Sequence, residues 1–347
     1  MEPAALIPAA EAIPSHWTAI ETMLVATFAL HIVFMNLTVG SAIIAAWGKI
    51  TGRHEDLAAE LGHRLPTTLA LTVNFGVPPL LFVQVLYGQF LYTSSVLMAA
   101  FWLSGIALVI AGYYGLYASD AKAHDAPGLS RLALLFSLAC LLAMGLLLSN
   151  NMTLMIRLDA WARYAENPRG TLLNFSDPTL WPRYVHMILA APAVAGLYAA
   201  LIGAKKRRQD WIDHGLAWFT RITMLQLLVG GWLLMALPRN VMLGFMGGSP
   251  LATGSLAVGV ALALAGLLAG IRKNPPQAAA LTLAAVLAMA VSRAEVRTLT
   301  LAPLWQASSL PVSGEAGPVL LFAGSLAFGL ALIVYMVRLY TRAQGRG

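Results

Sequence analysis

Long apolar runs, separated by short polar segments, dominate the pattern along this chain. A helix needs about 20 mainly apolar residues to cross a bilayer, and nine runs meet that length. They predict an all-α membrane helix bundle with spans at residues 19–47, 66–90, 95–118, 131–152, 183–204, 216–238, 251–271, 277–298 and 317–340. The eighth run is the weakest because it is Ala-rich and ends among charged residues. Eight spans with one surface helix is therefore the alternative.

The composition strengthens the membrane interpretation. Of the 347 residues, 59% are hydrophobic and only 11% are charged, whereas a soluble domain has about 25% charged residues. Such a chain cannot cover its surface with polar groups, which excludes an ordinary soluble protein. The net charge of +7 does not indicate nucleic acid, because the basic residues lie in short segments between apolar runs. We expect contact with the lipid bilayer and no nucleic-acid partner.

The basic residues alternate between the two sides of the predicted bundle. The side rich in Lys and Arg is expected to be cytoplasmic. This places the N-terminus outside and the C-terminus inside, which requires an odd number of spans and agrees with nine. The segment before the first span contains no Lys or Arg, unlike a signal peptide, so we expect it to be retained.

The cysteine content excludes several kinds of centre. Cys140 is the single cysteine, so the chain holds no internal disulfide, Cys-rich zinc site or iron–sulfur cluster. The C-x-x-C-H motif of covalent c-type haem is also absent.

Two histidines lie inside apolar runs, where polar side chains are costly and therefore mark candidate sites. His31 lies near the middle of span one, and His186 lies near one end of span five. A neutral imidazole inside a helix bundle suits haem iron; the alternative is a hydrogen bond to a neighbouring helix. Met235 and Met242 are candidates for a second axial ligand, although most methionines serve simple packing.

Arginines near the predicted outer face are candidate partners for anionic groups. Arg239 directly follows Pro238 at a span end, and Arg pairs well with carboxylates such as haem propionates. The alternative is snorkelling to the membrane surface. A quinone site needs apolar or aromatic walls and a few hydrogen-bonding groups. The candidates for it are Glu295, Arg293, Arg297 and Trp305.

Span two contains Pro78 and Pro79. Two prolines remove backbone donors and are expected to kink or break the helix. Broken helices also occur at the substrate sites of transporters. A haem-free transporter or membrane anchor subunit therefore stays open as an alternative function.

Four segments resemble subunit I of the cytochrome bd quinol oxidases. The segment LVATFALHIVFMNLTVGSAIIAAWG is similar to the first helix of that family, and His31 falls on its haem-ligand position. GHRLPTTLALTVNFGV resembles the second helix, with Asn74 in its Asn-Phe pair, and LLLSNNMTLM resembles the end of the fourth, with Asn150 at its Asn. PRYVHMILAAPAVAGLYAA is similar to the fifth helix, where His186 falls on the low-spin haem b ligand.

The resemblance covers about residues 15–205 and divides the chain into a haem-binding part, 1–205, and further transmembrane helices, 206–347. It implies one or two b haems, quinone as substrate, partner subunits and the bacterial inner membrane.

Two features depart from the family: no Asp or Glu lies between Glu60 and Asp120, and only a short segment joins Pro238 to Pro250. Oxygen reduction consumes protons through ionisable relays. We therefore expect a subunit that transfers electrons between the quinone pool and a periplasmic partner such as a c-type cytochrome. A quinol:oxygen oxidoreductase subunit is the alternative.

Overall fold

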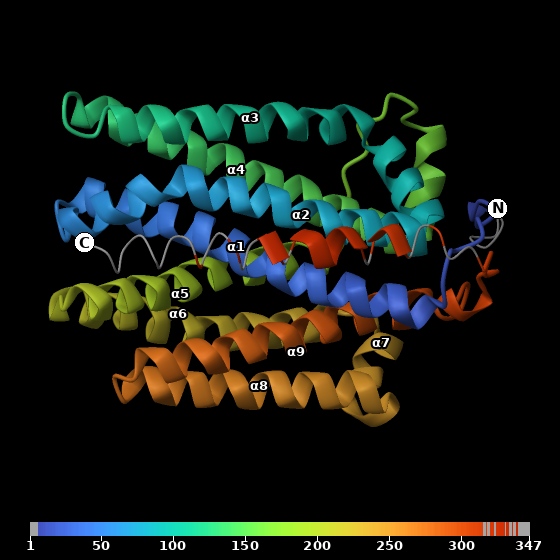
Figure 1. Ribbon diagram of the computed structural model, residues 1–347. Coiled ribbons are helices and arrows are strands. Elements are labelled where there is room, and N and C mark those ends of the chain that lie inside the picture. Colours follow the sequence, from blue (N-terminus) through green and yellow to red (C-terminus); the bar gives the residue numbers. More distant parts are fainter. Residues whose placement is uncertain are drawn as a thin grey trace.

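The computed structural model describes residues 6–314, together with residues 317, 320–322, 324–329, 331, 332, 335 and 338. This part of the chain is all-α, and its only β-type pairing is an isolated bridge between Ile13 and Val312. Eight of its helices are long and apolar enough to cross a membrane (Figure 1). They are α1 (Trp17–Thr51), α2 (Glu55–Leu97), α3 (Ala99–Ala121), α4 (Pro127–Ile156), α5 (Leu180–Lys206), α6 (Gln209–Ala236), α8 (Pro250–Ile271) and α9 (Pro275–Leu301).

Six of the first eight predicted spans fall within one of these helices; 95–118 begins in the last turn of α2 and crosses Met98 into α3, and 216–238 runs two residues past the end of α6. The eighth run forms α9 (Pro275–Leu301), a full-length apolar helix packed against α8, and not a surface helix. The ninth predicted span, 317–340, runs over residues outside the described part of the chain. The prediction of an all-α membrane bundle is confirmed.

The expected break in span two is not at the prolines. Pro78 and Pro79 lie inside α2, which continues through them. The departure from helical geometry comes later, at Tyr87, with φ −128° and ψ 28°. Gly88 follows directly, and glycine gives the backbone the freedom that such a bend needs. Neighbouring groups in a membrane bundle can satisfy the carbonyls that proline leaves free, so proline alone does not decide where a helix bends.

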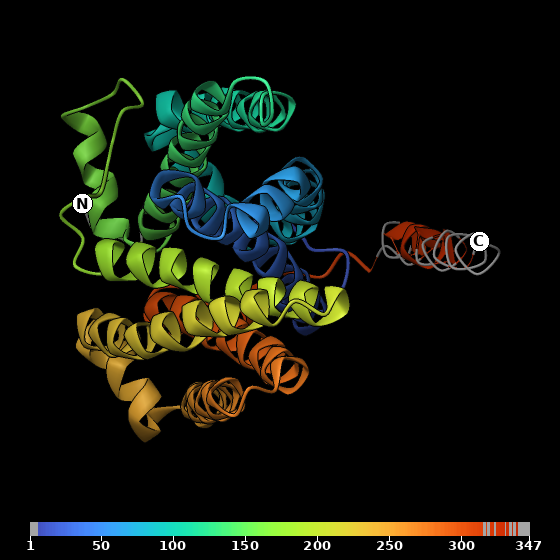
Figure 2. The ribbon, with the colours of Figure 1, turned by 90° about the vertical axis from the view of Figure 1, so that its left-hand side faces the viewer.

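The helices pair as antiparallel hairpins around α1. The pairs are α1 with α2, α3 with α4, α5 with α6, and α8 with α9, while α1 also contacts α4, α5 and α9 (Figure 2). Small residues allow this close approach, as is usual between membrane helices. A Cβ atom on Gly40 of α1 would lie 2.0 Å from the carbonyl oxygen of Ala191 in α5. The boundary expected near residue 205 falls in the turn between α5 and α6, which pack closely against each other.

The two ends of the bundle differ. We call the end that holds the α1–α2, α3–α4, α5–α6 and α8–α9 turns the basic end; it lies at the left of Figure 1. The opposite end, here the far end, holds a 3₁₀ helix (Leu158–Ala165) and the short helix α7 (Arg239–Leu243). The N-terminal segment is held there, because the N–H of Ile13 donates to the carbonyl of Pro311 at 2.8 Å.

Candidate functional site

His31 is held in one tautomer by the neighbouring helix. Its Nδ1 lies 3.0 Å from the carbonyl oxygen of Thr72 in α2. A carbonyl only accepts, so Nδ1 carries the proton and donates. Nε2 is then the unprotonated nitrogen, and it makes no hydrogen bond with any described residue. The ring also lies against Gly76, where an added Cβ would come 3.0 Å from Cε1.

His186 is placed differently. Its ring lies against Gly230 of α6, where an added Cβ would come 3.2 Å from Cε1. The backbone carbonyl of His186 accepts a hydrogen bond from Gln226 at 2.8 Å. Its Nδ1 is buried and has no partner among the described residues. A buried polar atom without a partner is costly, so this nitrogen is free to meet a ligand.

A buried ion pair joins the first and last described spans at the far end. Arg297 of α9 donates to Glu21 of α1 at 2.6 Å, across 276 positions of the sequence. The side chains are only 6% and 16% exposed, respectively. The Nε of Arg297 remains buried without a partner in the described structure.

Tyr87 and Trp305 complete this arrangement. The hydroxyl of Tyr87 donates to the second oxygen of Glu21 at 3.1 Å, and the guanidinium of Arg297 lies 4.1 Å from the centre of the Tyr87 ring. Trp305 packs edge-on against Tyr87, with ring centres 5.4 Å apart. The bend of α2 at Tyr87 therefore lies at a polar cluster and not at the prolines.

Arg293 extends the cluster toward His31. Its guanidinium stacks on Phe28 of α1, 4.1 Å from the ring centre, and no described acceptor binds it. Its charge acts on Arg297, Arg183, Glu21 and His31. We call Glu21, Tyr87, Arg293, Arg297 and Trp305 the buried cluster. It contains one carboxylate and two guanidinium groups, so it has a surplus of one positive charge.

The remaining predicted site residues lie elsewhere. Glu295 faces the start of α8, where Ser249 donates to it at 3.4 Å. Met235 is 72% exposed on the bundle surface, and Arg239 is also exposed. Met242 is partly buried against an apolar group around Val241. The structure therefore brings Arg293, Arg297 and Trp305 together and leaves Glu295 outside their contacts.

The side chains of the two predicted asparagines form hydrogen bonds within the protein. Asn74 is exposed, and its amide donates to the carbonyl of Ala70 in its own helix at 2.9 Å. Asn150 is fully buried; its oxygen accepts from the backbone of Asn174 at 2.7 Å, and its nitrogen donates to the sulfur of Met98 at 3.3 Å. Asn150 thus fastens the end of α4 to the segment before α5.

Glu21 and Tyr87 were not among the predicted site residues. A signal for Glu21 was present, because an acid inside an apolar span is a candidate site by itself, and 19–47 was predicted as a span. Tyr87 carries no comparable signal, since a tyrosine near a span end is typical of the membrane interface. Its role depends on the bend in α2, which only the structure places.

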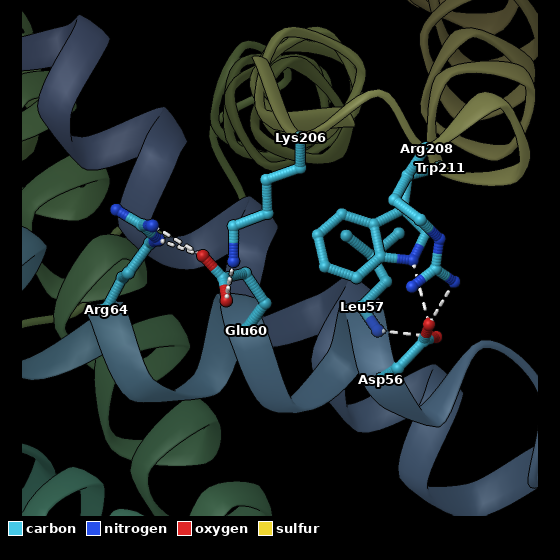
Figure 3. Close-up of polar contacts among 7 residues, drawn as sticks. All are labelled: Asp56, Leu57, Glu60, Arg64, Lys206, Arg208 and Trp211. Atoms are coloured by element: carbon cyan, nitrogen blue, oxygen red, sulfur yellow. Dashed lines mark hydrogen bonds and ion pairs between the residues drawn. The ribbon is translucent and has the colours of Figure 1, made fainter. Parts of the chain in front are cut away.

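The basic end carries a second cluster of charges (Figure 3). Glu60 accepts from Lys206 at 2.7 Å and from Arg64 at 2.5 Å. Arg208 binds both Asp210 and Asp56, and these hydrogen bonds raise the pKa of the guanidinium. We call these side chains the basic-end cluster. It has three acidic members, Asp56, Glu60 and Asp210, and three basic members, Arg64, Lys206 and Arg208.

The described residues contain no group of three or more His, Cys, Asp or Glu side chains placed to hold a metal ion. A centre held by protein ligands alone is therefore not indicated in this part of the chain. No protein-family model matches the chain, and no curated protein matches it.

Proposed function

We propose that this protein is a b-type haem subunit of a bacterial inner membrane, which passes electrons between the quinone pool and a periplasmic partner such as a c-type cytochrome. The observation that carries the proposal is the state of His31. Its Nδ1 proton is engaged by the Thr72 carbonyl, and its Nε2 is left with a free lone pair. Histidines that ligate metals usually donate their other nitrogen in this way, which fixes the tautomer and the ring orientation.

The surrounding residues fit a haem. His186 offers a second imidazole with a buried, unpartnered nitrogen, and glycines at both rings leave the imidazoles room that a Cβ would take. Arg293 lies near His31 without a carboxylate of its own, which suits the anionic propionates. When bound, a b-type haem supplies a one-electron redox centre. His31 and His186 would be the iron ligands of one or two such haems, and the helices around them exclude water.

The distribution of acids favours electron transfer over oxygen reduction. No Asp or Glu lies between Glu60 and Asp120, which covers most of α2 and α3. Oxygen reduction inside a membrane needs a relay of ionisable groups. The basic end suits the cytoplasmic side by its Lys and Arg content. In that orientation the far end, with the buried cluster, faces the periplasm and the expected partner.

Visible spectroscopy of the purified protein tests the proposal. We expect a Soret band and a b-type pyridine haemochrome, with reduction by quinol. His31→Ala and His186→Ala should each lose haem, whereas His214→Ala should not, because the Nε2 of His214 already accepts from Trp218 at 3.0 Å. Absence of a haem spectrum in the unmodified protein overturns the proposal. Quinol-dependent oxygen consumption assigns the oxidase reaction in its place.

A further inference from the structure

We infer that Glu21 is the proton-accepting group of a quinol site formed by the buried cluster, with Arg297 and Tyr87 as its hydrogen-bonding groups and Trp305 as its aromatic wall. This inference rests on the proposed quinone reaction and adds the site and the route of the proton. Glu295 was the one acid among the predicted quinone residues, but it faces α8 and lies outside the buried cluster. The acid inside the cluster is Glu21.

The position of Glu21 suits a proton acceptor. It lies in the first turns of α1 at the far end, so the distance to the aqueous side is short. Its two oxygens accept hydrogen bonds from Arg297 at 2.6 Å and from Tyr87 at 3.1 Å. A carboxylate oxygen held beside a bound quinol can act as a general base and accept its proton.

The arginines around Glu21 have spare hydrogen-bonding capacity. The Nε of Arg297 is buried and unpartnered, and Arg293 has no described acceptor. These groups are donors only. The two oxygens of a quinone or quinol are acceptors that such donors can bind.

Aromatic side chains form the walls beside these polar groups. Trp305 packs against Tyr87 and Phe90, with ring centres 5.4 and 5.1 Å apart. A flat aromatic headgroup stacks well on such rings. An aromatic wall beside a few convergent polar groups is the usual composition of a small-molecule site.

The reaction balances as follows. When a quinol becomes a quinone, two O–H bonds break, two electrons leave singly to a one-electron acceptor of the b-haem class, and two protons leave. The first proton goes to a carboxylate oxygen of Glu21, which releases it to the water at the far end. The second proton then leaves by the same route.

The experiment measures reduction of the haem by a short-chain benzoquinol and a short-chain naphthoquinol in nanodiscs, over a range of pH. The groups that face Glu21 are Tyr87, Arg293, Arg297 and the more distant Glu295. The rate in the unmodified protein should depend on pH, because the quinol gives up two protons as it is oxidised. Glu21→Gln should lower the rate by about a hundredfold and flatten the pH profile.

Two further variants separate a chemical role from a structural one. Glu21→Asp should recover part of the rate, because it restores the carboxylate. The matched control Glu295→Gln should keep both rate and pH profile, since Glu295 lies at the same end but outside the buried cluster. An unchanged rate and pH profile in Glu21→Gln overturns the inference.

Direct binding of the oxidised short-chain quinones, measured by equilibrium dialysis, keeps the inference testable if Glu21→Gln does not fold. Trp305→Leu changes no charge and should weaken binding by about tenfold. Unchanged binding overturns the site. A protein without haem overturns the proposed function. A haem protein that quinol reduces, but whose quinone binding is unchanged in Trp305→Leu and whose rate is unchanged in Glu21→Gln, overturns this inference alone.

Discussion

The buried cluster and the basic-end cluster are built from the same kinds of side chain, but they differ in exposure and in charge balance. At the basic end three acids face three bases, and the side chains of Asp56, Arg208 and Asp210 are 43–47% exposed. At the far end Glu21 faces two arginines, and the side chain of Arg297 is 6% exposed. Water screens most of the first set, in which Glu60 is the least exposed side chain at 19%, and it screens the pair of Glu21 and Arg297 much less. Identical ion pairs therefore have different consequences in the two places.

The two clusters should differ most in the free energy of unfolding that is lost when one charge of a pair is removed. Exposed pairs contribute little to stability, while breaking a buried pair leaves a charge without solvent or partner. The basic-end cluster thus orders short turns at little cost. In the buried cluster each charge depends on its partners, because little water reaches it.

The largest predicted effect is that of Arg297→Leu. It leaves the Glu21 carboxylate unpaired and should lower the free energy of unfolding by about 3–5 kcal/mol. The double variant Glu21→Leu, Arg297→Leu removes both charges and should recover most of that loss. Reversible unfolding in detergent micelles measures both. A double variant no more stable than Arg297→Leu breaks the comparison.

A smaller effect is expected from Glu60→Gln at the basic end. Glu60 is the acceptor for Arg64 and Lys206, whose side chains are 42% and 44% exposed. The change should lower the free energy of unfolding by about 1 kcal/mol or less, and high salt should reduce the difference further. The same unfolding assay at low and high salt tests this. A loss as large as that of Arg297→Leu contradicts the role given to exposure.

The smallest change in stability is expected at Asp159, which tests whether exposure or position in the bundle sets the cost. Asp159 lies at the far end but is 63% exposed, and it binds Arg157 at 3.0 Å. The hydrogen bond from Arg157 lowers the pKa of Asp159. Its small contribution is therefore present above the unfolded pKa of about 4 and is lost as pH falls through the lower folded pKa.

We therefore expect Asp159→Asn to be slightly less stable than the unmodified protein near neutral pH and equally stable in strong acid. Unfolding measured as a function of pH checks this convergence. A large difference at neutral pH contradicts the comparison, because it would tie the cost to the far end and not to burial.

Part of the candidate site could be predicted from sequence, and part could not. His31 and His186 stand out because an imidazole in an apolar run is conspicuous wherever the run folds. Arg293, Arg297 and Trp305 could be grouped because all lie near one span end, and the structure brings them close together. Glu295 is two residues from both arginines, yet it points to α8, because neighbouring positions on a helix face different directions.

The sequence by itself determined the all-α membrane bundle, the positions of its first eight spans and the end at which basic residues gather. Apolar length and charge are local properties, and they act on each segment separately. Only the tertiary structure decided that Glu21 meets Arg297, that α2 bends at Tyr87 and that Thr72 fixes the tautomer of His31. These outcomes depend on which helix lies beside which. That choice follows from contacts between small residues such as Gly40 and Ala191, which no periodic pattern records.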